Sequence, residues 1–249
     1  MGDKYEDLKE EMYQEYYIHS GKSKLLVKIW SDALGSNYPE GLNNFGFVTK
    51  KDLKQISKHL VDTNGSSLLD IGCGIGGPGL HIAEQHKLEL TGIDIVEEAI
   101  NQANLFKENF TLNYDAKFEL GDFCNIPLPD ASMDNMISID AFWMVHDKVN
   151  ALKEIKRVMK KKGKFIFTTW DSVLFDPASL FEANGFTIVA NEVTENWKQY
   201  QLRIYDDILK HQKQLLEEIG DSAEILISEA TTVPPMLEIT ERRLYCIQN

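Results

Sequence analysis

The sequence predicts an α/β protein built on a doubly wound, mostly parallel sheet, and three observations support this prediction. From Ser67 onward, short apolar runs alternate with longer stretches of helical periodicity, which is the pattern of repeated βα units. The first apolar run leads into a glycine-rich turn and then into a helical stretch. The chain of 249 residues is also an ordinary length for one such domain.

The predicted elements follow one another in a regular order. The predicted strands are residues 67–71, 88–93, 116–120, 133–139 and 164–169, followed by 186–194 and a final strand over 239–247. Helical stretches near residues 77–86, 96–110 and 147–160 separate the earlier strands. A further short helix is expected to begin at Asp176-Pro177 and to end at Gly185, because Asp caps free N–H groups and Pro is tolerated in the first turn.

Both ends of the chain carry additional helical patterns. Residues 1–34 have the pattern of an acidic amphipathic helix, and Thr49 is placed to cap a helix that reaches about Val61. Apolar residues at three- and four-residue steps predict a long amphipathic helix over residues 197–219. No linker long enough to separate two domains is visible, so residues 1–249 are expected to form a single domain.

The chain is strongly acidic, with 26 Lys and Arg against 39 Asp and Glu and a net charge of −13. This surplus repels phosphate backbones, so we expect no nucleic-acid partner. The N-terminus lacks an apolar signal region, and no window approaches about 18 uninterrupted apolar residues, so we expect no membrane partner. Cys73, Cys124 and Cys246 are too few and too far apart for a disulfide framework or a C-x-x-C metal site. We therefore expect a soluble, cytoplasmic protein.

The most informative segment is the glycine loop DIGCGIGGPG, which begins at Asp70. Glycine allows positive φ and close approach of a ligand to the backbone, and the following helix offers unpaired N–H groups. Two interpretations are open. Gly72, Gly74 and Gly77 fit the dinucleotide fingerprint G-x-G-x-x-G. Asp70 with Gly72, Gly74 and Gly76 instead fits the D-x-G-x-G-x-G loop of methyltransferases that use S-adenosylmethionine.

Residues beyond the loop bear on this choice. Asp94, which ends the second strand, can bind the ribose diol of either cofactor and does not discriminate. Asp70 would repel a pyrophosphate but suits a ligand that carries an ammonium group and a sulfonium. Gly121-Asp122-Phe123 offers an acceptor for an adenine amino group beside an aromatic face, and the chain ends without a second parallel βαβ half. An NAD-dependent oxidoreductase is therefore the less favoured alternative.

Through these residues the chain resembles the class I methyltransferases, within the small-molecule group related to ubiquinone, sterol and natural-product methyltransferases. The resemblance covers roughly residues 45–190, through LLDIGCGIGGPGLHIA, TGIDI, FELGDFCNIPLPDASMDNMISIDAF and ALKEIKRVMKKKGKFIFTTW. It implies a Rossmann-like, seven-stranded, mostly parallel sheet with an antiparallel last strand and helices on both faces. Residues 1–45 would form a helical N-terminal cover, residues 46–190 the cofactor-binding core, and residues 191–249 a helical insertion with the last strand.

The resemblance also implies the contacts of the cofactor, S-adenosylmethionine, whose product would be S-adenosylhomocysteine. Asp70, Gly72 and Gly74 would hold its methionyl part and sugar. Asp94 would bind the ribose diol, and Ile95 would cover the adenine. The remaining implied contacts are Asp122 and Phe123 at the other adenine edge, with Ser138 and Asp140 at the methionyl amine or the substrate side. The alternative for Phe123 is that it only packs in the hydrophobic core.

Methyl transfer from a sulfonium to a small organic acceptor is an in-line displacement, and its main requirement is alignment. A hydroxyl or protonated amine acceptor also needs a base, and His146, just past the fourth strand, is the candidate. The alternative is that His146 or Asp147 caps the helix that follows. Trp143 and Met144 either line an apolar substrate pocket or are buried under the cover. Their place after the fourth strand makes them substrate candidates.

Tyr17 and His19 in the N-terminal helix are further substrate candidates, and packing of the cover is the alternative role for both. Ser138-Ile139-Asp140-Ala141 lacks the Pro-Pro pair of DNA adenine enzymes, and Trp170-Asp171-Ser172 lacks the Asp-Asn pair of metal-dependent catechol enzymes, so we expect no metal. A protein that binds S-adenosylmethionine as a sensor or scaffold, without transferring the methyl group, is a second open function. The acceptor atom (O, N or C) and the oligomeric state stay undetermined by the sequence.

Overall fold

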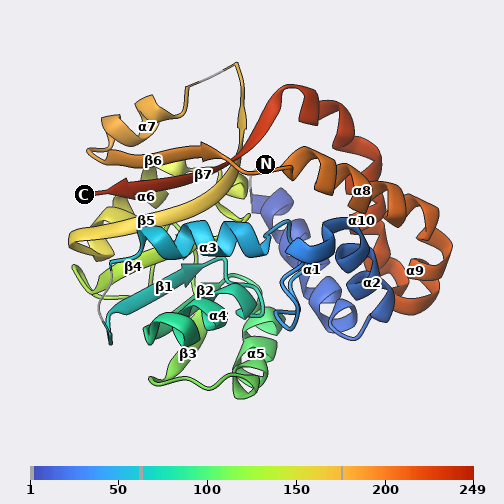
Figure 1. The fold of residues 1–249 in the computed structure, drawn as a ribbon, viewed down its shortest axis with the longest axis horizontal. Coiled ribbons are helices and arrows are strands. Elements are labelled where there is room, and N and C mark those ends of the chain that lie inside the picture. Colours follow the sequence, from blue (N-terminus) through green and yellow to red (C-terminus); the bar gives the residue numbers. More distant parts are fainter. Residues whose placement is uncertain (1–2, 62–63, 175) are drawn as a thin grey trace.

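A seven-stranded sheet runs through the molecule in the order β3-β2-β1-β4-β5-β7-β6 (Figure 1). The computed structural model describes residues 3–61, 64–174 and 176–249. The strands are β1 (Ser67–Ile71), β2 (Glu89–Asp94), β3 (Ala116–Leu120), β4 (Met133–Ser138), β5 (Met159–Ser172), β6 (Thr187–Val193) and β7 (Thr240–Gln248). β1 to β5 pair in parallel, whereas β7 lies antiparallel between β5 and β6. The predicted sheet with its antiparallel last strand is confirmed.

The central strands β1 and β4 are buried along most of their length on both faces, as expected for parallel strands covered by helices on each side. Asp70 of β1 lies in register with Gly92 of β2 on one side and with Ile137 of β4 on the other. The strand order reverses between β1 and β4, and ligands of open α/β sheets bind at the carboxyl edge of such a switch point.

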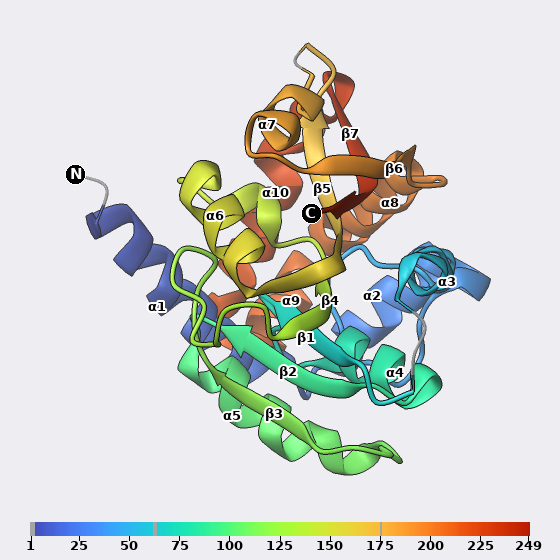
Figure 2. The same ribbon diagram turned by 90° about the vertical axis from the view of Figure 1, so that its left-hand side faces the viewer.

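Helices cover both faces of the sheet, as Figures 1 and 2 show for α3 and α4 on one side and α6 on the other. One face carries α3 (Lys50–His59), α4 (Gly77–His86) and α5 (Glu97–Phe106), and the opposite face carries α6 (Lys148–Val158) and α7 (Ala178–Ala183). Each layer buries its own hydrophobic cluster against the strands. The predicted cap of α3 is confirmed, because Thr49 and Asp52 form a capping box at its first turn.

Five helices gather beyond the carboxyl ends of the parallel strands, at the right of Figure 1. They are α1 (Asp3–Ser20), α2 (Lys24–Leu34), α8 (Trp197–Lys210), α9 (Gln212–Ile219) and α10 (Ala223–Thr232), called here the helical cover. Its two chain segments share one hydrophobic cluster, in which Leu26 and Trp30 of α2 pack with Ile204 and Ile208 of α8. The cover is therefore held together by contacts between the two ends of the chain.

Several predicted boundaries are wrong in detail. The helix expected over residues 1–34 is broken between α1 and α2, where Ser23 caps the second helix. The helix expected over residues 197–219 is broken at His211, and α10 was not predicted because its ten residues are rich in apolar and β-branched side chains without a clear stripe. β5 begins directly after α6, at Met159, because that residue pairs with Met133 of β4.

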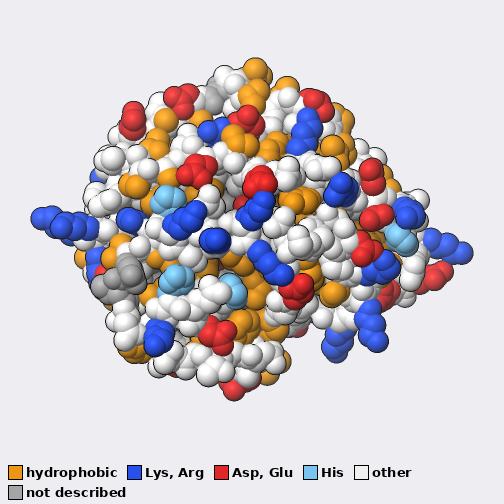
Figure 3. Space-filling model, viewed as in Figure 1, with side chains coloured by type: hydrophobic (Ala, Val, Ile, Leu, Met, Phe, Trp, Pro, Cys, Tyr) orange, Lys and Arg blue, Asp and Glu red, His pale blue; other side chains and the backbone are white. Residues whose placement is uncertain are grey.

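Short 3₁₀ turns complete the fold at Gly35–Asn37, Lys107–Asn109, Phe142–Met144 (η3), Gly220–Ser222 and Pro234–Glu238. Among the helices that the structure describes, none is long and apolar enough to span a bilayer. On the face drawn in Figure 3, basic and acidic side chains are interspersed.

Candidate functional site

The glycine loop is held against β2 by its own backbone. The N–H groups of Gly72 and Cys73 donate to the Ile93 carbonyl at 2.8 and 3.0 Å. Gly72 and Gly74 both have positive φ, of 70° and 54°, which explains the need for glycine at these two positions. A Cβ on Gly72 would also lie 2.5 Å from the Ala141 side chain, so the loop after β1 touches the segment after β4.

Asp94 is buried at the end of β2 and faces this loop. Its Oδ2 accepts the Gly74 N–H at 2.8 Å, and its Oδ1 accepts the Val96 N–H at 3.0 Å. Burial raises the pKa of Asp94, and the N–H groups of Val96, Gly74 and Ile95 oppose that rise. The carboxylate therefore organises two backbone segments while carrying a charge that no nearby cation balances among the described residues.

Asp70 is buried at 2% exposure beneath the first turn of α4. Burial, together with the charge of Asp94, raises its pKa from 3.8 to about 7, and the Gly79 N–H acts in the opposite direction. A Cβ on Gly79 would lie 2.5 Å from Asp70 Oδ2, and one on Gly77 would lie 2.0 Å from the Leu42 carbonyl oxygen. Gly77 and Gly79 are thus required by close packing.

The turn after β3 contributes the other side of the predicted cofactor site. Asp122 Oδ1 accepts hydrogen bonds from the backbone N–H groups of Cys124 and Asn125. Phe123 packs edge-on against Phe142 at 5.6 Å between ring centroids, so it also belongs to the core on that face. Ile95 is 51% exposed, unusual for isoleucine beside a buried strand.

The end of β4 and the segment after it hold two predicted site residues, Ser138 and Asp140, which differ in their hydrogen bonding. Ser138 is fully buried, and within the described chain its Oγ has no hydrogen-bond partner. Asp140 has a positive φ of 60°, and its carboxylate is fully engaged. Its Oδ1 accepts Thr168 Oγ1 at 2.8 Å and Arg242 Nε at 2.9 Å, and its Oδ2 accepts the Phe47 N–H at 2.9 Å. The contact of Asp140 with a methionyl amine stays a prediction.

Arg242 is a buried residue that the sequence analysis missed. It is 1% exposed and also donates Nη1 to Asp52 Oδ2 at 3.0 Å, so it joins β7 to α3 and to the segment after β4. Burial alone would lower the pKa of the Arg242 guanidinium, but the charges of Asp140 and Asp52 raise it above its ordinary value. The sequence indicated this burial, because alternate residues of a strand share one face and Arg242 alternates with the buried Leu244 and Cys246.

Trp143 and Met144 lie on η3 and are both partly exposed, at 43% and 38%. Trp143 Nε1 donates to the Asp140 carbonyl at 2.9 Å, and its ring meets the edge of Trp170 at 6.1 Å. His146 is exposed, and Asp147 supplies the cap of α6 by accepting the Asn150 N–H at 2.9 Å. The capping role therefore belongs to Asp147, and the role of His146 as a base stays a prediction.

Tyr17 brings the helical cover onto the glycine loop. A Cβ on Gly74 would lie 2.8 Å from Tyr17 Oη, so the hydroxyl rests on the loop backbone. Burial and the charge of Asp94 raise the pKa of Tyr17. His19, by contrast, lies 3.6 Å from Glu15 on the exposed side of α1. Of the two N-terminal candidates, Tyr17 faces the loop.

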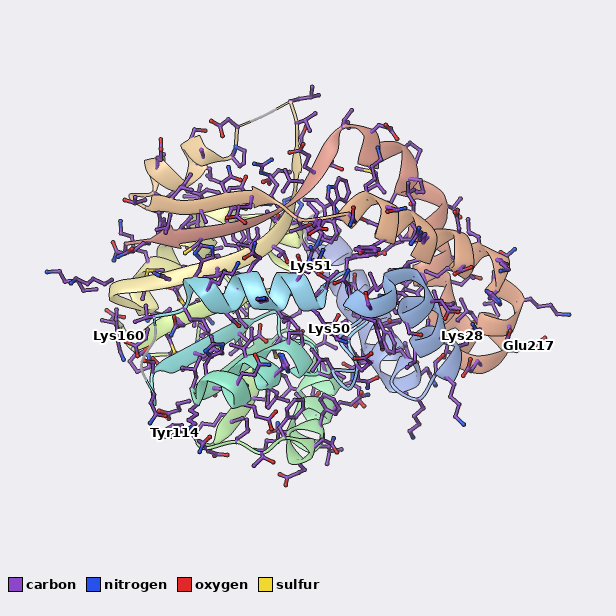
Figure 4. All side chains as sticks on the ribbon, viewed as in Figure 1. Lys28, Lys50, Lys51, Tyr114, Lys160 and Glu217 are labelled. Carbon is purple, nitrogen blue, oxygen red and sulfur yellow. The ribbon has the colours of Figure 1, made fainter. Side chains whose placement is uncertain are left out.

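The structure thus brings together Asp70, Gly72, Gly74, Asp94 and Tyr17 at the switch point, while His19 and His146 lie at the surface. Two buried carboxylates beside a glycine turn suit a cationic ligand, because each opposes an anion. A separate hollow of about 430 Å³ lies between α2 and α9. It opens on the outer side of the cover, where the labelled Lys28 and Glu217 lie in Figure 4. Within residues 3–61, 64–174 and 176–249, no cluster of His, Cys, Asp and Glu could hold a metal ion.

Comparison with known proteins gives a consistent result. A family model described as a methyltransferase domain matches residues 62–232. Sterol 24-C-methyltransferase ERG6B of Gibberella zeae is 35% identical over 106 residues, which are 43% of this chain and 28% of that protein. O-methyltransferase rstn1 of Aspergillus nomiae is 28% identical over 152 residues, which are 60% of this chain and 65% of that protein. The chain therefore matches from about a quarter to about two thirds of the length of these relatives.

The fold is shared with solved structures. The crystal structure of the [4+2]-cyclase SpnF superposes with a TM-score of 0.73, at 18% identity, over 90% of this chain and 92% of that one. At this identity the likeness concerns the fold.

Proposed function

The chain belongs to the methyltransferase domain family, and on that basis we propose that it transfers a methyl group from S-adenosylmethionine to a small organic acceptor. The observation that carries the proposal is the pair of buried carboxylates, Asp70 and Asp94, that flank the glycine loop at the switch point. A ligand with a sulfonium and an ammonium group supplies the positive charge that this pair lacks. A pyrophosphate would meet the same carboxylates with repulsion, which disfavours NAD.

The residues present fit the parts of this cofactor. Asp94 carries the carboxylate for the ribose hydroxyls, and Gly72 and Gly74, both at positive φ, form the turn that would face the methionyl part. The exposed Ile95 would cover one face of the adenine, with Phe123 and Asp122 at its other edge. Among the described residues Asp122 Oδ2 accepts no hydrogen bond, so it is available to the adenine amino group. The unpartnered Ser138 Oγ is available to the methionyl amine.

When bound, S-adenosylmethionine supplies a methyl group activated by a positively charged sulfur. The chain's own residues contribute position and exclusion of water. Asp70 and Asp94 orient the ligand from the sheet side, and Tyr17 closes over it from the cover. Holding two reactants in line can lower a barrier by about 7–11 kcal/mol, so positioning alone accounts for a large acceleration.

Calorimetry with S-adenosylmethionine, S-adenosylhomocysteine and NAD tests the cofactor assignment. Both sulfur compounds are expected to bind and NAD is not. Asp94→Ala is expected to weaken binding by about a hundredfold, because charge-assisted hydrogen bonds contribute about 1.5–3 kcal/mol each. Asp115→Ala, at the amino end of β3, is the matched control and should bind normally. Binding of NAD but of neither sulfur compound would falsify the proposal.

An acceptor screen with a labelled methyl group tests transfer itself. We expect label to appear in a small organic product and S-adenosylhomocysteine to accumulate in equal amount. A protein that binds the cofactor but only senses or scaffolds would bind both sulfur compounds and label nothing across the screen.

A further inference from the structure

Asp140 joins the sheet to the segment that leads out of the helical cover. Thr168 Oγ1 on β5 and Arg242 Nε on β7 both donate to its Oδ1, at 2.8 and 2.9 Å. Its Oδ2 accepts the N–H of Phe47 at 2.9 Å, and Phe47 lies between α2 and α3. The Asp140 N–H in turn donates to Thr168 Oγ1 at 2.9 Å. The backbone and the side chain of Asp140 are therefore fixed together.

The same residue connects the two sides of the candidate site through its backbone. Ala141, the next residue, packs on the glycine loop, since a Cβ on Gly72 would lie 2.5 Å from its side chain. The Asp140 carbonyl accepts Trp143 Nε1 at 2.9 Å and so orients an indole that is 43% exposed on η3. Asp140 thus stands between the predicted cofactor loop and the turn that carries the substrate candidates. A shift of Asp140 would change the separation of these two surfaces.

The backbone of Asp140 needs support from its surroundings. Its φ is 60°, and a non-glycine residue in such a conformation persists where the neighbouring structure over-determines it. Both side chains that bind Oδ1 are buried, and Arg242 is itself anchored by donating Nη1 to Asp52 Oδ2 at 3.0 Å. A buried ion pair holds its geometry, because either charge left unpaired is costly. The position of Asp140 is therefore set from inside the protein.

We propose that Arg242 and Thr168 are positioning residues for methyl transfer, which act through Asp140 to fix the turn that carries Trp143 against the glycine loop. This inference rests on the proposed function. In-line transfer requires the acceptor, the methyl group and the sulfur to be aligned, and a displacement of about 1 Å can lower a rate about a hundredfold. In this role Arg242 and Thr168 contact neither the cofactor nor the acceptor, and they exchange no proton.

Thr168→Val is the least disruptive test, because valine keeps the shape of threonine and removes only the hydroxyl. With the compound labelled in the acceptor screen, kcat is expected to fall about tenfold or more, while the KM for S-adenosylmethionine changes less than about threefold. Arg242→Lys, which keeps the charge but loses the planar fork that binds both carboxylates, should act in the same direction. Thermal unfolding establishes that each variant is folded at the assay temperature.

Each of these variants has a matched control on its own strand. Thr169 is as buried as Thr168 but lies on the opposite face of β5, and Arg243 is the next residue after Arg242 on β7. Thr169→Val and Arg243→Lys should therefore keep the kcat and the KM of the wild type. A loss of kcat in the controls equal to that in the test variants would contradict a positioning role.

Trp143 provides a readout that needs no acceptor. Its share of the fluorescence change on addition of S-adenosylhomocysteine is obtained, in each variant, by comparison with the same protein carrying Trp143→Phe. The wild type should show a change, because Ala141 and Asp140 link Trp143 to the glycine loop. Thr168→Val and Arg242→Lys should lose most of this change, although calorimetry should show S-adenosylhomocysteine binding close to that of the wild type. A loss of stability alone would not produce this pattern.

Asp140→Ala tests whether the two residues act through Asp140. Once the carboxylate is absent, adding Thr168→Val should lower kcat little further, because residues in one network are not additive. An additional loss as large as the one that Thr168→Val causes in the wild type would show that Thr168 acts by another route.

The outcomes are distinguishable from failure of the proposed function. If the wild type does not bind S-adenosylhomocysteine, or labels nothing in the acceptor screen, the proposed function fails and takes this inference with it. If transfer is measured but Thr168→Val and Arg242→Lys keep the kcat and the Trp143 signal of the wild type, the positioning role is wrong and the proposed function stands. The same holds if both variants lose S-adenosylhomocysteine binding as strongly as Asp94→Ala, because the network would then serve cofactor binding rather than alignment.

Discussion

At the scale of single residues, the candidate site is an accumulation of negative charge where the fold provides little to balance it. Asp70 and Asp94 are both buried, burial raises the pKa of each, and the charge of Asp94 raises the pKa of Asp70 further. Such groups lower the stability of the ligand-free protein and mark functional positions more often than structural ones. A cationic ligand would stabilise these two carboxylates, so ligand binding should also raise the free energy of unfolding.

Asp70→Asn should make this link measurable. The pKa of Asp70 is raised from 3.8 to about 7, so its contribution to stability is full below about pH 4 and is lost as the pH rises through about 7. Wild-type protein should therefore lose up to about 4 kcal/mol between pH 4 and pH 8 from this group, at about 1.4 kcal/mol per pKa unit. Urea unfolding across this pH range should show a shallower decline for Asp70→Asn.

The same substitution should weaken S-adenosylmethionine about tenfold or more, because it removes a charge next to a cationic ligand. Asp115→Asn, an exposed carboxylate, provides the control for both measurements. Equal pH dependence in Asp70→Asn and wild type would show that Asp70 does not titrate in this range.

Gly77→Ala tests the packing of the glycine loop. The new Cβ would lie 2.0 Å from the Leu42 carbonyl oxygen, and backbone cannot move aside as a flexible side chain can. We expect a loss of about 1–3 kcal/mol in urea unfolding, as for other overpacked sites. Gly21→Ala is the control, since its Cβ would meet the ends of two polar side chains, Gln102 at 3.2 Å and Asn43 at 3.8 Å. A stability equal to that of wild type would contradict the close approach of α4 to this segment.

At the scale of elements, Arg242 ties together parts of the chain that are far apart in sequence. Asp52 completes the capping box of α3, and Asp140 follows β4. Arg242 on β7 binds both carboxylates, and its guanidinium lies over the Trp170 ring at 5.5 Å. Because Asp140 directly precedes Ala141, which touches Gly72, this network supports the segment that lines the site.

Arg242→Met should destabilise the protein by about 3–5 kcal/mol, since removing one partner leaves two buried carboxylates without a cation. Arg243→Met, the next residue on β7, removes a partly exposed pair with Glu241 and should cost about 1 kcal/mol or less. Urea denaturation of the two variants gives the comparison. Similar losses for both would mean that the buried network contributes little beyond an ordinary surface pair.

At the scale of the whole molecule, the helical cover and the sheet meet at the carboxyl edge, and the cover joins both ends of the chain in one cluster. Tyr17 of α1 rests on the glycine loop, and Tyr13 reaches η3. The cover is therefore placed to respond when a ligand occupies the loop.

Hydrogen exchange should report this response. Addition of S-adenosylhomocysteine is expected to slow amide exchange in the part of α1 around Tyr17 as well as in the glycine loop, because Tyr17 rests on the loop and is ordered together with it. α7, on the far side of the sheet from α3 and α4, should exchange at an unchanged rate. Protection confined to the loops after β1 and β2 would contradict a role for α1 in closing the site.

The local parts of the fold were predictable because they depend on short-range chemistry. The glycine loop, the Thr49 cap of α3 and the paired strands follow from glycine φ, capping and apolar runs, which neighbouring residues determine. The sequence did not predict where the cover helices break, at Ser23 and at His211, nor did it predict α10. Packing between the two ends of the chain decides where those helices stop.

The sequence by itself determined the α/β class, the order of the elements and the family resemblance at the glycine loop, since these rest on periodicity and on residues close together in the chain. Only the tertiary structure decided what each charged side chain meets. Asp140 meets Arg242 across 102 positions of sequence, and Asp52 meets the same guanidinium across 190 positions. The physical reason is that burial and charge are properties of neighbours in space, and only the packed cover brings those neighbours together.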